Sequence, residues 1–252
     1  METNEDPRPL WSDAFEVEFH ECDARGQFDL AALANRMQVT AWRHFWHIDE
    51  RRGPLLGPGQ AWIMIRMELR IQRPLHCRDQ VLLETWPRGI EGITALREFR
   101  LLGPDGEAAM LATTSWVVLD IETARVQRLR DQTAKWPTLP ERSFLGKTAE
   151  KLPPPADPVF DAPFPVRYRD LDANRHVNHV RYIEWTLDRL PAQLLRERAI
   201  RSFEINFFEE ARCDEAVEAG LSAPSDSEYL LSLRRCDDKK EVCRSRIAFG
   251  ER

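Results

Sequence analysis

The sequence predicts an α+β protein built from two copies of one unit, and three observations support this prediction. Its 252 residues suffice for two domains that each bury a core. Two stretches far apart in the chain share one pattern at a constant offset, and a proline-rich segment separates them. Each stretch is followed by a helical periodicity and then by about four strand-like runs.

The repeat becomes visible when FEVEFHECDARGQF (15–28) is aligned with FPVRYRDLDANRHV (164–177), at an offset of 149 residues. Apolar residues alternate at the start of both stretches, which is typical of a strand with one buried face. Asp23 of the first copy then matches Asp172 of the second. The chain therefore contains the same structural unit twice.

A helix is predicted after each of the two stretches. In the first copy, apolar residues recur at helical spacing over 30–48, behind Asp29 as an N-cap candidate. In the second copy the same spacing covers 180–190, behind Asn178. The runs that follow each helix are typical of antiparallel strands, and GPDGE (103–107) predicts a hairpin turn between two of them.

A single sheet in each copy can bury its apolar face only by wrapping around its helix. This arrangement is the hotdog, and two of them in one chain form a double hotdog, with the two sheets either side by side or continuous. Eight of the seventeen prolines fall between Pro137 and Pro165, which favours an extended connector there. We predict an N-terminal hotdog domain (1–136), a Pro-rich linker (137–162) and a C-terminal hotdog domain (163–252).

Composition narrows the classes of partner and compartment. The net charge of −6 disfavours nucleic acid as a general partner. No run of 18 apolar residues is present, so no membrane span is expected. The five cysteines are odd in number and lack CxxC spacing, which favours reduced thiols over a disulfide framework or a zinc site. With no signal-peptide pattern at the N-terminus, the expected compartment is the cytoplasm, and we expect no metal and no cofactor.

The signature of a known family lies in the second copy. DLDANRHVNHVRYIEW (170–185) resembles the signature stretch of the acyl-acyl carrier protein (acyl-ACP) thioesterases of plants and bacteria. Further similar stretches are WRHFWHID (42–49), 61–89 and 114–129. The resemblance implies a thioester hydrolase of fatty acid biosynthesis that releases free fatty acid from acyl carrier protein.

The family pattern also implies which residues line the active site. Its D-x-N-x-H motif corresponds here to Asp172, Asn174 and His176. A glutamate on a later strand corresponds to Glu210, or to Glu209 if the register slips by one. The plant enzymes carry a cysteine directly after this glutamate, and Ala211 stands at that position here. This departure favours direct attack by water over a covalent acyl-cysteine.

These residue types supply what thioester hydrolysis needs. Glu210 or His176 can act as the base that activates water. Asn174 can position the substrate or donate a hydrogen bond to the developing oxyanion, and Asp172 can orient its neighbours. In the first copy, Arg25 and Gln27 stand at the positions of this asparagine and histidine, so the first copy keeps the framework without the catalytic side chains. We therefore expect the C-terminal domain to be catalytic and the N-terminal domain to bind the acyl chain.

Plainer structural roles compete with these assignments. Aspartate and asparagine after a strand commonly form Asx turns, and a lone histidine is more often structural than catalytic. Cys213 is a candidate for a substitute nucleophile, but a structural thiol is the favoured interpretation of this residue. Four polar groups between apolar elements nevertheless need a reason to be tolerated, which favours the catalytic interpretation.

The sequence also offers candidates for binding the acyl chain and the carrier protein. Trp62, Met64 and Trp86 are candidates for the wall of an acyl pocket in the first copy, although core packing explains aromatic residues equally well. Residues 164–201 contain eight arginines against five acidic residues, so Arg175 and Arg181 are candidates for docking an acidic carrier protein. Such a run is also compatible with a solvated helix face.

Three other functions stay open from the sequence. An acyl-CoA thioesterase would use the same chemistry on another carrier. A hotdog dehydratase would also combine a histidine with a carboxylate, and a non-catalytic acyl-binding module would need only the pocket. The chain could act as a monomer, because it contains both hotdogs, or as a homodimer.

Overall fold

The computed structural model of the chain describes residues 6–129, 136–146 and 148–251. The first half contains β1 (Trp11–Glu16), the short 3-10 helix η1 (Phe19–Glu21), α1 (Leu30–Arg52), β2 (Gln60–Ile71), β3 (Gln80–Glu91), β4 (Thr94–Leu102), β5 (Ala108–Asp120) and β6 (Arg125–Gln127). The second half contains β7 (Val159–Phe160), β8 (Phe164–Pro165), η2 (Tyr168–Asp170), α3 (His179–Leu187), α4 (Ala192–Glu197), β9 (Ala199–Phe207), β10 (Ala216–Ser225), β11 (Glu228–Arg235) and β12 (Glu241–Gly250).

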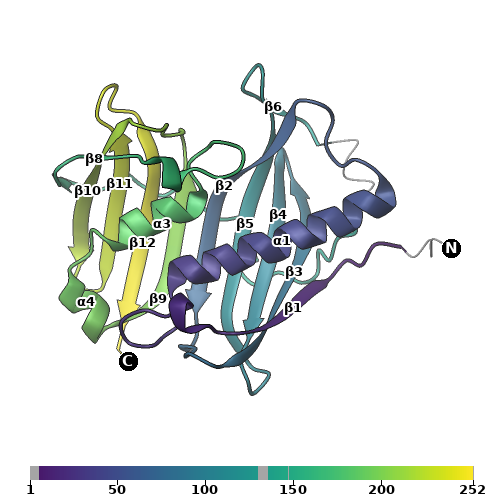
Figure 1. Cartoon of the computed structure of the whole chain (residues 1–252), viewed down its shortest axis with the longest axis horizontal. Coiled ribbons are helices and arrows are strands. Elements are labelled where there is room, and N and C mark those ends of the chain that lie inside the picture. The colour runs from purple at the N-terminus through teal and green to yellow at the C-terminus, as the bar shows by residue number, and fades with distance from the viewer. Residues whose placement is uncertain (1–5, 130–135, 147, 252) are drawn as a thin grey trace.

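All of these strands belong to one antiparallel sheet, which is the continuous alternative of the predicted fold. Its order is β1-β3-β4-β5-β2-β9-β12-β11-β10-β7, with β6 added to β5 and β8 to β10. The halves meet where β2 pairs with β9, from Arg66 opposite Asn206 to Arg70 opposite Ser202. The helices α1 and α3 lie next to each other on the same face of the sheet (Figure 1). The predicted double hotdog is confirmed.

Capping residues mark both ends of the long helix α1. The Asp29 carboxylate accepts hydrogen bonds from the backbone N–H groups of Ala31 and Ala32, and Gly53 follows the last turn with φ of 76°. Leu33 and Met37 belong to the stripe that α1 buries against the sheet. Among the residues described, no helix is long and apolar enough to cross a membrane.

The second helix is shorter than its apolar period suggested. Asn178 caps α3 as predicted, by accepting from the N–H of Val180. The helix ends at Leu187, and Pro191 stands immediately before α4. Proline has no N–H and its ring clashes with the preceding turn, so the helix cannot continue through residue 191, and α4 begins after it as a separate helix.

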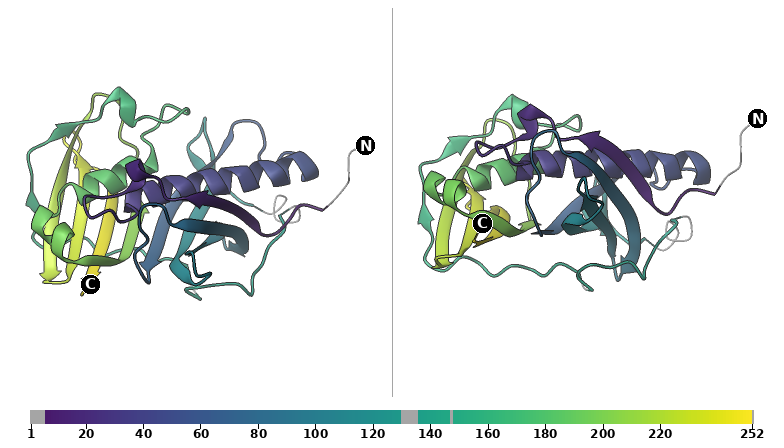
Figure 2. Two further views of the ribbon diagram at one scale, coloured as in Figure 1. Left: turned by 60° about the horizontal axis from the view of Figure 1, so that its bottom comes forward. Right: turned by 90° about the horizontal axis from the view of Figure 1, so that it is seen from below.

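The proline-rich linker crosses the face of the sheet that the helices leave uncovered (Figure 2). In the first half, Arg66 donates to the carbonyl of Ala149 at 2.8 Å. In the second half, the Asn206 carboxamide accepts from the N–H of Leu152 at 2.8 Å, and Arg244 donates to the Leu152 carbonyl at 2.5 Å. The linker is thus bonded to both halves of the sheet, and both sheet faces are covered.

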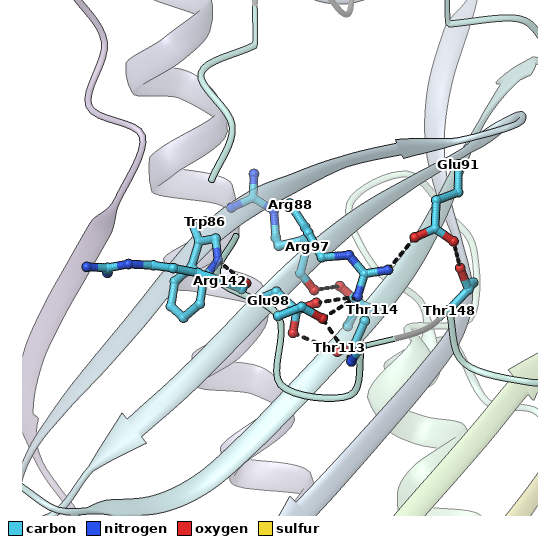
Figure 3. A network of polar contacts seen from close by, with 11 residues as sticks. Trp86, Arg88, Glu91, Arg97, Glu98, Thr113, Thr114, Arg142 and Thr148 are labelled. Carbon is cyan, nitrogen blue, oxygen red and sulfur yellow. Dashed lines mark hydrogen bonds and ion pairs between the residues drawn. The ribbon is translucent and has the colours of Figure 1, made fainter. Parts of the chain in front are cut away.

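A buried ion pair anchors the start of this linker (Figure 3). Arg88 donates to Glu98 at 3.0 Å, to Glu91 at 2.7 Å and to the hydroxyl of Ser143 at 2.8 Å. Thr113 donates to the second oxygen of Glu98 at 2.7 Å. Burial raises the pKa of Glu98, an effect that the Thr113 hydroxyl and the Arg88 charge oppose.

Replacing Glu98 by alanine is expected to lower the free energy of unfolding by about 3 kcal/mol, because it leaves the buried Arg88 without its most buried partner. Chemical denaturation measures the loss. Glu122→Ala removes a carboxylate from an exposed turn and serves as the control, with an expected change below about 0.5 kcal/mol. Equal effects of the two substitutions would contradict the role assigned to the ion pair.

Candidate active site

The loop 172–178, here called the second-half loop, is built on the side chain of Asp172. Its Oδ1 accepts from the backbone N–H of Asn174 at 2.8 Å and of His176 at 3.2 Å. Arg175 between them has a left-handed backbone with φ of 66°. Asp172 therefore forms an Asx turn that orients the backbone carrying the two other motif residues.

The first half contains the same loop at residues 23–29, here called the first-half loop. Asp23 Oδ1 accepts from the N–H of Arg25 at 2.8 Å and of Gln27 at 3.1 Å. Gly26 has φ of 72° at the position equivalent to Arg175. The repeat predicted from the sequence thus extends to individual hydrogen bonds.

The structure brings His176 and Glu210 together. His176 Nε2 lies 3.8 Å from Glu210 Oε1, and both side chains are about half exposed. Glu209 lies 4.0 Å from Lys240 instead, so Glu210 is the one of the two alternatives that lies next to His176. Among the described residues the exposed Asn174 amide has no hydrogen-bond partner, so it is available to a ligand.

The backbone on either side of Glu210 is held by two side chains from other elements. The buried Ala211 donates its N–H to the hydroxyl of Tyr182 on α3 at 3.2 Å. Arg235 at the end of β11 donates to the carbonyl of Glu210 at 2.6 Å. Glu210 is thereby fixed against the helix that follows the second-half loop.

Two residues of this region were not predicted, His179 and Tyr182. At the offset of 149 they correspond to Leu30 and Leu33, so the second half carries polar groups where the first is apolar. The His179 ring packs edge-on against Phe207, with ring centroids 6.4 Å apart. Burial lowers the pKa of His179 to about 4. The position-by-position comparison of the two copies would have identified both residues.

The chemistry of the site is that of a histidine, a carboxylate and an amide. Burial, followed by the charge of Asp214, raises the pKa of the Cys213 thiol, which disfavours this residue as a nucleophile. Ala211 offers no nucleophile either. Within the described part of the chain, no three histidine, cysteine or carboxylate side chains group as metal ligands.

The predicted acyl-pocket residues divide between the two faces of the sheet. Met64 belongs to the core between the sheet and α1, and Trp62 packs against Trp136 with ring centroids 5.0 Å apart. Trp86 lies on the other face, where its Nε1 donates to the carbonyl of Arg142 in the linker at 2.9 Å (Figure 3). The placement of Trp86 in an acyl pocket was therefore wrong, because the linker covers that face.

The two predicted docking arginines also differ. Arg175 is exposed on the second-half loop. Arg181 lies 2.5 Å from Glu184 and 3.8 Å from Asp170, so its charge is compensated by two carboxylates. Of the two, Arg175 has the exposed side chain beside His176, and its part in docking stays a prediction.

A cavity of about 490 Å³ opens beside the first-half loop. Its lining includes Arg25 and Asp29 from that loop, Met110 from β5, and Leu187 and Leu195 from α3 and α4. None of the residues predicted for catalysis or acyl binding lines it. The cavity therefore lies between the two halves, with the first-half loop on one side and α3 and α4 on the other.

The fold and the site define a double hotdog protein in which a histidine of one of the two equivalent loops faces a carboxylate of the β9–β10 connection. The N-terminal domain of the acyl-ACP thioesterases matches residues 9–136, and the C-terminal domain of the same family matches residues 155–249. The chain belongs to the acyl-ACP thioesterase family.

Relatives and solved structures agree with this assignment. The chain is 26% identical over 211 residues to oleoyl-acyl carrier protein thioesterase 1, chloroplastic, of Arabidopsis thaliana, covering 73% of this chain and 58% of that protein. It is 26% identical over 272 residues to the chloroplastic palmitoyl-acyl carrier protein thioesterase of Gossypium hirsutum, covering 95% of this chain and 63% of that protein. The chain thus spans about half to two thirds of the length of these plant relatives.

Two solved structures share the whole fold. An acyl-ACP thioesterase from Bacteroides thetaiotaomicron superposes with a TM-score of 0.85 at 20% identity, over 98% of this chain and 100% of that one. The 12:0-ACP thioesterase from Umbellularia californica superposes with a TM-score of 0.82 at 20% identity, over 97% and 98% of the chains. At this identity the superpositions establish the fold.

His179 makes the protein lose stability in acid. Because the pKa of His179 falls from 6.5 to about 4 on folding, the unfolded state binds a proton below pH 6.5 that the folded state does not. The stabilisation present at neutral pH is therefore lost as the pH drops from 6.5 toward 4, by about 2 kcal/mol between pH 7 and pH 5. His179→Leu, which installs the residue of the first half, should reduce that loss. Denaturation at both pH values measures it, and identical pH dependence in both proteins would contradict the assignment.

Proposed function

We propose that this protein hydrolyses the thioester of fatty acyl-ACP to free fatty acid and carrier protein. The observation that supports the proposal most is the His176–Glu210 pair, 3.8 Å apart and exposed. The Asn174 amide lies on the same loop as His176 and has no hydrogen-bond partner among the described residues. The family of the chain and the names of its relatives point to the same substrate class.

The separation of the pair suits a single activated water. An oxygen about 2.8 Å from His176 Nε2 can lie equally close to Glu210 Oε1, so both groups can hold one water. Attack by this water forms the new C–O bond of the acid while the proton passes to the pair and then to the departing thiolate, as the C–S bond breaks. Asn174 donates to the carbonyl oxygen as negative charge develops there.

Asp172 acts in this scheme through the backbone. Its carboxylate accepts from the N–H groups of Asn174 and His176 and so fixes the spacing of the amide and the imidazole. Tyr182 performs the corresponding task for Glu210, by holding the next N–H of the chain. Catalysis thus depends on two rigid backbone segments, one from a loop and one from the start of the β9–β10 connection.

We assign acyl binding to the first half, between α1 and the face of the sheet it covers. Met64 and Met67 of β2 face this space together with Met37 of α1. Unbranched thioether side chains adapt readily to ligands of different shape, which suits an alkyl chain. Trp62, two residues before Met64 on β2, adds an aromatic side chain that packs against Ala95 and Val118.

The carrier and the compartment rest on the sequence and the relatives. Arg175 beside His176 suits an acidic carrier protein, and the local charge would equally attract the phosphates of coenzyme A. The oligomeric state, monomer or homodimer, stays a prediction. The cytoplasm as the compartment also stays a prediction, and the plant relatives are named as chloroplastic. Thiol release measured in parallel from acyl-ACP and acyl-CoA distinguishes the carriers.

His176→Ala and Asn174→Ala should each lower kcat for acyl-ACP hydrolysis at least about a hundredfold, because one removes the proton acceptor and the other the oxyanion donor. Release of the carrier thiol, followed with a chromogenic reagent, gives the rate.

The repeat supplies matched controls for these substitutions. Gln27→Ala and Arg25→Ala change the equivalent positions of the first-half loop, and both variants should retain kcat within about threefold of the wild type. Thiol release that survives in the histidine and asparagine variants, with the fold intact by circular dichroism, would refute the proposed function.

A further inference from the structure

Arg97 is a charged residue buried inside the first half. It lies on β4 with 5% of its surface exposed and extends from the face of the strand opposite to Glu98 (Figure 3). Its Nη1 donates to His44 Nδ1 on α1 at 3.1 Å and to the Thr85 hydroxyl at 3.2 Å. The guanidinium therefore faces the space between α1 and the sheet.

The charge of Arg97 is not compensated by the part of the chain that the structure describes. Three arginines are buried there, and two of them contact carboxylates: Arg88 binds Glu98, and Arg244 binds Glu241. Arg97 has no carboxylate within 4 Å among these residues. Burial alone lowers its pKa to about 9, so the group is still charged at neutral pH.

His44 cannot supply the missing negative charge. Since Arg97 donates to Nδ1, the proton of the imidazole sits on Nε2, which lies 2.8 Å from the carbonyl of Arg8 and donates to it. Burial, followed by the Arg97 charge, lowers the pKa of His44 to about 3, so the ring is neutral. The cluster keeps one net positive charge.

Two further donors without acceptors lie next to this charge. The Trp136 ring is 5.9 Å from the Arg97 guanidinium, and the Trp62 ring is 5.0 Å from Trp136. The indole N–H of each is buried and has no acceptor among the described residues. A cavity of about 270 Å³, lined by Gly89, Ile90 and Thr138, reaches Trp136.

An excess of buried donors around an uncompensated cation is costly unless a ligand supplies acceptor oxygens and negative charge. We infer that Arg97, Trp62 and Trp136 form a binding site for a carboxylate carried on an alkyl chain. Ala95, Val118 and the Trp116 ring line the apolar side of the same cluster and suit the methylenes next to the carboxylate.

Two sources can present this chemistry. One is free fatty acid, and the other is the distal carboxylate of a dicarboxylic acyl group on the carrier protein. The second source, and the place of the alkyl chain in the first half, rest on the function proposed above. Binding of a free carboxylate does not require hydrolysis, so the two ideas can fail separately.

The test compares dodecanoate with 1-dodecanol, using the tryptophan fluorescence of the whole protein. Wild-type protein should bind the carboxylate at least about tenfold more tightly than the alcohol. Arg97→Gln keeps a donor for His44 and removes the charge, so it should abolish this preference without lowering the denaturation midpoint. Arg100→Gln is the matched control on the outer face of the same strand, where Arg100 pairs with Glu84, and it should preserve the preference.

A second arm compares hydrolysis of dodecanoyl-ACP and dodecanedioyl-ACP. If the dicarboxylic substrate is turned over faster and this advantage is lost in Arg97→Gln, the bound carboxylate belongs to the acyl tail. If both substrates are turned over equally and dodecanoate inhibits competitively, the bound carboxylate belongs to free fatty acid. Equal binding of acid and alcohol by the wild type, or a preference that persists in Arg97→Gln, would overturn the inference. Carboxylate binding without hydrolysis of either substrate would support it and contradict the proposed function.

Discussion

The pairing of β2 with β9 is the interaction on which the rest of the structure depends. Each strand is the edge of its own half-sheet, and an unpaired edge would expose a row of backbone donors and acceptors. Joining the two edges makes one sheet, and it places α1 and α3 next to each other on one face. The linker must then cross the other face to connect β6 with β7, and its hydrogen bonds to Arg66, Asn206 and Arg244 follow from that path.

Duplication gave two equivalent loops, and a few side chains make them chemically different. The aspartate that folds each loop is kept, so the backbone survives in both halves. In the second half, His176 and Asn174 occupy positions that the first-half loop fills with glutamine and arginine. The hydrogen bonds shared by the two loops explain how one half could lose or gain catalytic side chains without losing its fold, since each loop depends on backbone N–H groups that every residue except proline provides.

The sequence predicted the features that depend on local pattern. The two helices, their caps Asp29 and Asn178, and the two aspartate loops are encoded within a few residues of each other, and all are present. The approach of Glu210 to His176 was expected only through the family resemblance, because it joins segments more than thirty residues apart.

Features that depend on both sheet faces could not be predicted. Trp86 was misplaced because β3 is buried almost continuously, so the alternation that normally separates the two faces of a strand is absent. The linker that buries the second face has no periodic pattern to reveal its path. Arg181 was expected to be available, but the helix spacing that brings it to Glu184 compensates its charge.

The most direct test of the account is the hydrolysis of fatty acyl-ACP by Glu210→Gln and by Glu209→Gln. The two residues are adjacent, and only Glu210 faces His176. The account predicts that Glu210→Gln loses at least about a hundredfold in kcat while Glu209→Gln keeps wild-type turnover. Full activity in Glu210→Gln, or loss confined to Glu209→Gln, would contradict a reaction at the His176–Glu210 pair.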